Sequence, residues 1–109
     1  MAFPTNGRWD AILILKNKAG QRLDIAGKNF AMGLMSDLRN DSPEVTLSTT
    51  DGTLIADVNG RLRMNVPYTI TKTLTQGQYH FDIVELLDEG DQAFVAEGKL
   101  TLRRGITRN

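Results

Sequence analysis

The sequence has no cysteine and a single histidine, His80, among its 109 residues. The absence of cysteine excludes disulfide bonds, thiol catalysis and every zinc site built on cysteine. One histidine is too few for a metal site that needs several imidazoles. The sequence therefore predicts no metal centre of either kind.

The chain also lacks an excess of charge of either sign, because thirteen lysines and arginines balance thirteen aspartates and glutamates. Modules that bind nucleic acid through phosphate attraction normally carry a basic excess, and so do polybasic membrane-surface proteins. The longest apolar run, residues 11–15, is far short of the roughly 20 residues that cross a bilayer. No signal peptide is visible at the N-terminus. We therefore expect no nucleic-acid partner and no membrane segment.

Length and composition are those of one folded domain. Hydrophobic residues make up 40% of the chain and charged residues 24%, the balance of a globular rather than a disordered protein. A chain of 109 residues can form one hydrophobic core but not two separate ones. We expect a single domain over residues 1–109, with short arms at 1–7 and 105–109.

The dominant pattern is hydrophobic alternation with a period of two, which is typical of strands. In residues 61–66, for example, Leu62, Met64 and Val66 alternate with polar side chains. Residues 9–16 are apolar on both faces, which is typical of a central strand covered on both sides. The predicted strands are 9–16, 29–36, 45–49, 53–58, 61–66, 78–86 and 92–104.

Turn residues separate these strands. Asp51-Gly52 and Asn59-Gly60 predict two hairpins, because a type I′ turn needs positive φ at both central residues. Residues 70–74 could form one helical turn, and no longer segment has helical periodicity.

About seven strands with turns every 8–12 residues predict an all-β, antiparallel β-sandwich, with a small β-barrel as the alternative. The inner faces of the strands predict which side chains form the core. These are Trp9, Leu13, Phe30, Met32, Leu34, Leu62, Met64, Tyr79, Phe81, Ile83, Phe94, Leu100 and Leu102.

His80 and Asp82 are candidates for catalysis, because they share the outer face of one strand. A hydrolase would also need a nucleophile for them to serve. Ser36, Ser42 and Ser48 are available, but none lies in a nucleophile-elbow motif. The favoured interpretation is a solvated strand face, and no catalytic residue is predicted.

Three further clusters have structural explanations that we favour. Asp88, Glu89 and Asp91 could offer oxygen ligands to calcium, but the EF-hand spacing is absent, so an acidic turn is expected. The glycine-containing turns lack the spacing of phosphate-binding loops. Four arginines would form a basic strip if their strands were neighbours, but no aromatic side chain lies between them to stack on bases. These arginines are Arg61, Arg63, Arg103 and Arg104.

Aromatic side chains could form a sugar-stacking platform, as in carbohydrate-binding modules. Trp9 and Tyr79 lie on predicted core faces, so we expect both to be buried. Tyr68, which follows Pro67, is the aromatic residue expected to be exposed.

The order of features along the chain resembles one family. A strand at 8–16 leads to a turn at Gly20, and an apolar segment at 23–27 closes on glycine. A strand with phenylalanine and methionine at 30–35 precedes a loop with Arg39, and Asp51-Gly52 and Asn59-Gly60 follow. Further matches are Gly77, residues 79–83, 97–102 and 105–108. In this order, the chain is similar to small phage and prophage tail and baseplate proteins, such as the N-terminal domain of the phage upper baseplate protein.

The resemblance implies an immunoglobulin-like sandwich that serves as a structural or adaptor protein of the virion. It implies no enzyme activity, no cofactor and no specific site residue. The expected partners are other virion structural proteins, and a homo-oligomer is also possible. A carbohydrate- or surface-binding module is the alternative, and an assembly chaperone or an enzyme are further possibilities.

Overall fold

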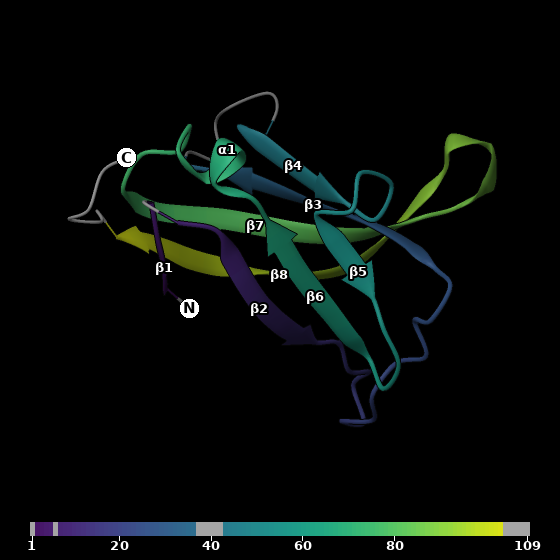
Figure 1. Ribbon diagram of the computed structural model, residues 1–109. Coiled ribbons are helices and arrows are strands. Elements are labelled where there is room, and N and C mark those ends of the chain that lie inside the picture. The colour runs from purple at the N-terminus through teal and green to yellow at the C-terminus, as the bar shows by residue number, and fades with distance from the viewer. Residues whose placement is uncertain (1, 6, 37–42, 104–109) are drawn as a thin grey trace.

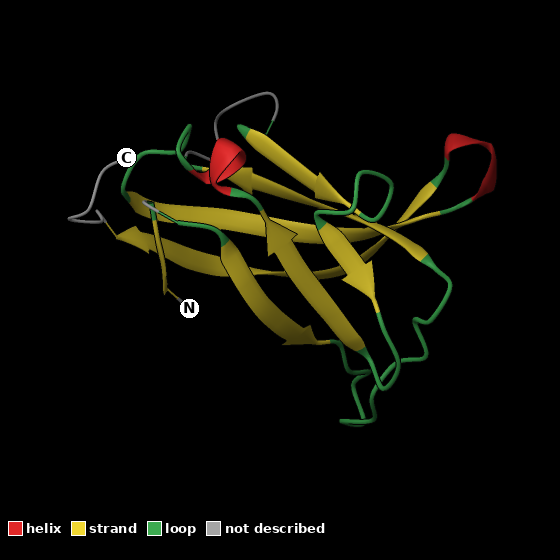
Figure 2. Cartoon of the chain, in the orientation of Figure 1, coloured by secondary structure: helices red, strands yellow, loops and turns green. Residues whose placement is uncertain are grey.

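Eight strands in the described residues form two sheets, so the predicted all-β class is confirmed (Figure 1). The computed structural model describes residues 2–5, 7–36 and 43–103. The predicted arm at 105–109 and Arg104 lie outside these residues. Within these residues helix is confined to two short turns, α1 (Tyr68–Thr71) and a 3-10 turn (Asp88–Gly90), which are red in Figure 2.

The larger sheet has five strands and the smaller one three, so the strands do not form one closed barrel. The five-stranded sheet has the order β1 (Ala2–Pro4), β8 (Gln92–Arg103), β7 (Gly77–Leu86), β3 (Asn29–Met35) and β4 (Val45–Ser48). The three-stranded sheet has the order β2 (Trp9–Ile14), β6 (Arg61–Val66) and β5 (Leu54–Ala56).

One hydrophobic core draws on the inner faces of both sheets. Leu13 and Phe81 are half-buried and pack against it, at the margin rather than the centre of the predicted core. Burial of large apolar side chains is the main stabilising term in a fold of this kind. Ten predicted core residues are buried: Trp9, Phe30, Met32, Leu34, Leu62, Met64, Tyr79, Ile83, Leu100 and Leu102.

The prediction that Phe94 belongs to the core is wrong, because its side chain is 65% exposed. The pairing of β7 with β8 shifts register between Ile83 and Val84: Ile83 is opposite Ala96, and Val84 is opposite Phe94. Val95 is therefore the extra residue of a β-bulge. One extra residue moves every side chain beyond it to the other face of the sheet. Phe94 thus lies on the outer face.

The prediction that residues 9–16 form a central strand is also wrong. β2 is an edge strand of the three-stranded sheet, paired only with β6 in the described structure. Trp9 faces the core, whereas Ile12 and Ile14 on the other face are exposed. β2 thus has the apolar composition of a strand that is buried on both faces, but in this structure only its Trp9 face is buried.

Of the two predicted hairpin turns, only Asn59-Gly60 has type I′ geometry. Asn59 and Gly60 have φ of 60° and 71°, and they join β5 to β6. The hairpin predicted at Asp51-Gly52 is wrong, because β4 and β5 belong to different sheets. The Asp51 carboxylate instead accepts hydrogen bonds from the Thr53 hydroxyl at 2.6 Å and the Thr53 N–H at 2.9 Å. These bonds fix the crossing between the sheets and lower the pKa of Asp51.

Residues 2–4 of the predicted N-terminal arm form a strand. β1 pairs in parallel with β8 and occupies the edge of the five-stranded sheet. The Phe3 ring stacks on Trp9, with ring centroids 5.0 Å apart, and the Trp9 indole N–H donates to the Pro4 carbonyl at 2.8 Å. The Thr5 N–H donates to the Arg103 carbonyl at 2.9 Å. Aromatic packing and hydrogen bonds therefore hold this segment against the core.

Candidate functional site

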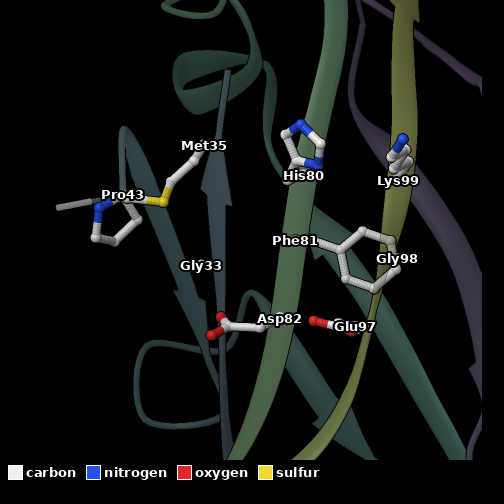
Figure 3. A pocket seen from close by; sticks show the side chains of 9 residues that line it. All are labelled: Gly33, Met35, Pro43, His80, Phe81, Asp82, Glu97, Gly98 and Lys99. Atoms are coloured by element: carbon white, nitrogen blue, oxygen red, sulfur yellow. The ribbon is translucent and has the colours of Figure 1, made fainter. Parts of the chain in front are cut away.

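A hollow of about 750 Å³ opens on the outer face of the five-stranded sheet, where β3, β7 and β8 lie side by side (Figure 3). Alternation places His80 and Asp82 on the face opposite to the buried Tyr79 and Ile83. The residues that line the hollow are Gly33, Met35, Pro43, His80, Phe81, Asp82, Glu97, Gly98 and Lys99.

The hollow exists partly because Gly33, in the middle of β3, has no side chain. A Cβ atom there would lie 3.3 Å from the Asp82 Oδ1 atom and 3.3 Å from the Pro43 Cβ atom. Figure 3 shows the Asp82 side chain pointing from β7 toward this glycine. A glycine in a strand often marks a place where another group approaches the backbone closely. Here that group is the Asp82 carboxylate.

Strand register arranges the polar side chains of the hollow in two rows. His80 is directly opposite Lys99, and Asp82 is directly opposite Glu97. On β3, Met35 extends the first row, and Gly33 extends the second. Asp82 and Glu97 therefore make one side of the hollow acidic, and Lys99 lies on the other side with His80.

The hydrolase hypothesis required a hydroxyl beside His80 and Asp82. Among the described lining residues there is none. The Ser36 hydroxyl donates to the Glu44 carboxylate, and the Ser48 hydroxyl accepts from the Asp51 N–H at 3.3 Å. Ser42 lies outside the described residues. The described residues therefore place His80 and Asp82 side by side without a hydroxyl group beside them.

The acidic turn predicted at Asp88, Glu89 and Asp91 forms the tip of the β7–β8 hairpin. Within the described ranges, no group of three or more carboxylate or imidazole side chains is arranged to hold a metal ion. The Leu87 N–H donates to the Asp91 carbonyl at 2.9 Å and closes the tip through the backbone.

The basic strip considered as an alternative does not form from the described arginines, because their strands are not neighbours. Arg61 and Arg63 lie on β6 in the three-stranded sheet, whereas Arg103 ends β8 in the five-stranded sheet. The aromatic predictions fare better: Trp9 and Tyr79 are each only 1% exposed. Tyr68, expected to be exposed, begins α1 and is half-buried. The sugar-binding alternative has therefore lost Trp9 and Tyr79, two of its three aromatic residues.

Sequence reasoning missed the exposed apolar side chains. Among the described residues, the large exposed ones gather in two places: the outer face of the three-stranded sheet with its β5–β6 turn, and the tip of the β7–β8 hairpin. The signal was visible in residues 9–16, which are apolar on both faces. The exposed residues are Ile12, Ile14, Ile55 and Val58 in the first place, and Leu87 and Phe94 in the second.

No protein-family model matches the chain, and no curated protein gives a significant match in sequence. The relation to phage tail and baseplate proteins therefore stays a prediction. In the described ranges, no helix has the length and apolar composition that a membrane span requires.

Proposed function

We propose that the chain is a non-enzymatic structural or adaptor protein that acts through protein–protein contacts in the tail or baseplate region of a phage or prophage particle. One observation carries the protein-contact part: among the described residues, Ile12, Ile14 and Ile55 are exposed together on one face of the three-stranded sheet. Scattered apolar residues are normal on a surface, whereas gathered ones are typical of interaction sites. The particle itself is inferred from the order of sequence features.

We also propose that the two sheets form an immunoglobulin-like sandwich. The support is the strand order. The sequence β8-β7-β3-β4 corresponds to the G, F, C and C′ strands of a variable-type domain, and β2-β6-β5 corresponds to B, E and D. An experimental structure with a different strand order would contradict this assignment.

Quantitative mass spectrometry of gradient-purified particles, induced from the source, tests the proposed function. A structural component is expected at a fixed number of copies per particle, and that number would indicate the symmetry of its position. Presence in the lysate together with absence from the particles would contradict a structural role. An assembly chaperone would then account for the same fold.

Glycan binding is the matching test of the alternative function. The full chain is not expected to bind immobilised glycans, because Trp9 and Tyr79 are buried. Saturable binding that is lost in a Tyr68→Ala variant would contradict the structural proposal and support a carbohydrate-binding module.

A further inference from the structure

The outer face of the three-stranded sheet combines exposed isoleucines with arginines. Ile12 is opposite Arg63, which is in turn opposite Ile55, so one row across the sheet reads isoleucine, arginine, isoleucine. The next row pairs Ile14 with Arg61. We call these five residues the isoleucine face. Its charged groups are both cations, and two acidic residues border it. The Asp57 N–H donates to the Arg61 carbonyl at 2.8 Å, and Asp10 lies in the next row, opposite Asn65.

The tip of the β7–β8 hairpin has the opposite charge and the same apolar character. Residues 87–94, here called the hairpin tip, carry exposed Leu87 and Phe94. Between them lie three exposed acidic residues, Asp88, Glu89 and Asp91. No lysine or arginine occurs in the sequence between Lys72 and Lys99. The tip is therefore acidic, with Phe94 on one face of the hairpin and Leu87 on the other.

The hairpin tip is also shaped before any partner binds. Backbone hydrogen bonds from Leu87 to Asp91 at 2.9 Å and from Asp91 to Asp88 at 3.3 Å close it. Figure 1 shows the hairpin projecting away from β1, beyond the rest of the strands. It leaves the isoleucine face of its own chain exposed. A preformed projecting element loses little conformational freedom on docking.

We propose that the hairpin tip of one copy docks on the isoleucine face of a second copy. This inference rests on the proposed function, which is protein–protein contact, and it identifies the partner as a second copy of the same chain. Acidic groups would meet Arg61 and Arg63, while Phe94, on the outer face of the hairpin, would cover the isoleucines. Because the two surfaces differ, the contact is head-to-tail, and repeated copies form a ring if the rotation closes.

Sedimentation velocity of the full chain over a range of concentrations tests self-association. We expect concentration-dependent association that weakens as salt is added, because exposed charge pairs are screened. A protein that stays monomeric at every concentration in low salt would overturn the inference.

Charge reversal identifies the surfaces. Arg63→Glu and Glu89→Arg each place like charges at the proposed contact, so each is expected to weaken association about tenfold or more. The double variant restores opposite charges and is expected to regain most of the lost affinity. Arg103→Glu is the matched control, since Arg103 is an exposed arginine on β8 of the other sheet, and it should leave association unchanged.

The pairing would be overturned if the single variants associate as tightly as the parent chain. It would also be overturned if the double variant associates no more tightly than the single variant of lower affinity. Thermal unfolding checks that each variant is folded, and Arg61→Glu replaces Arg63→Glu if that variant does not fold. The two proposals fail separately. Particles that contain a chain whose purified form is monomeric would end this inference alone, whereas self-association without presence in particles would end only the particle assignment.

Discussion

Replacement of Gly60 by alanine tests whether the β5–β6 turn holds its place by close backbone contact. Gly60 has φ of 71° and is buried, whereas Gly52 has φ of 84° and is exposed. Both positions are strained for a residue with a Cβ atom. They differ in their surroundings: a Cβ atom at Gly60 would lie 2.7 Å from the Leu15 carbonyl oxygen, and one at Gly52 would meet nothing within 4 Å.

Two separate effects lower the free energy of unfolding in these variants: backbone strain at positive φ and steric overlap of the added methyl group. Positive φ costs an alanine about 1 kcal/mol at either site. At Gly60 the added methyl also overlaps backbone, and overpacking of this kind costs about 1–3 kcal/mol. The backbone there cannot move freely, because the Leu15 N–H donates to the Gly60 carbonyl at 2.8 Å. We therefore expect Gly52→Ala to lower the free energy of unfolding by about 1 kcal/mol and Gly60→Ala by about 2–4 kcal/mol.

Urea unfolding of the two variants beside the parent chain measures both costs, provided that the denaturant slopes agree. Equal losses at the two positions would refute the argument, because they would show that only the backbone angle matters. A Gly60→Ala variant as stable as the parent would refute the close contact itself.

Three further predictions concern β1, the pairing of β7 with β8, and the crossing between the sheets. Phe3→Ala removes the ring stacked on Trp9 and should lower the free energy of unfolding by about 2–4 kcal/mol. The Thr5 amide, which donates to the Arg103 carbonyl, should also exchange faster with solvent. Unchanged exchange at Thr5 would contradict the anchoring of β1 by Phe3. A Cβ atom at Gly98 would lie 2.7 Å from the Phe81 ring, which points to β8 in Figure 3. Gly98→Ala should therefore destabilise the parent chain by about 1–2 kcal/mol. In a Phe81→Ala variant the ring is absent, so the same substitution should stabilise the strand by about 0.5 kcal/mol. Additive effects in this double-mutant cycle would refute the contact. The lowered pKa of Asp51 means that its carboxylate stabilises the fold above the unfolded value near 3.8, and that this contribution is lost as the pH falls through the lower folded pKa. The stability difference between the parent and Asp51→Asn should accordingly shrink below about pH 4 in acid-unfolding curves, and a constant difference would contradict the hydrogen-bond assignment.

Strand positions were predictable because the signal is local. All seven predicted strands form, and residues 61–66 coincide with β6. Alternation depends only on the side chains of one strand, so a single sequence reveals it. The strand β1 was missed because three residues cannot show a period, and what holds them is a stack between Phe3 and Trp9.

Relations between strands were not predictable in the same way. The exposure of Phe94 follows from a bulge opposite the Ile83–Val84 step, which belongs to the pairing of β7 with β8 and not to either strand alone. The Asp51-Gly52 dipeptide is typical of hairpin turns. Here, however, the Thr53 hydroxyl donates to the Asp51 carboxylate, and the chain crosses from β4 in one sheet to β5 in the other.

Only the part of the hollow that lies on one strand could be predicted from the sequence. His80 and Asp82 share a face by alternation, and that part followed from the sequence. Glu97 and Lys99 join them only because β8 pairs with β7, and Gly33 joins them only because β3 lies on the other side of β7. A site composed from three strands needs the sheet order, which no single strand encodes.

The composition of β2 connects the sequence with the proposed contact. Residues 9–16 have the apolar composition of a strand covered on both faces, but in this chain only the Trp9 face is covered. A solvated edge strand normally alternates apolar with polar residues. Exposed Ile12 and Ile14 break that rule on the same face where Arg61 and Arg63 supply positive charge. The composition is self-consistent if a second copy provides the missing cover, and the acidic apolar hairpin tip is the surface of this chain that complements it.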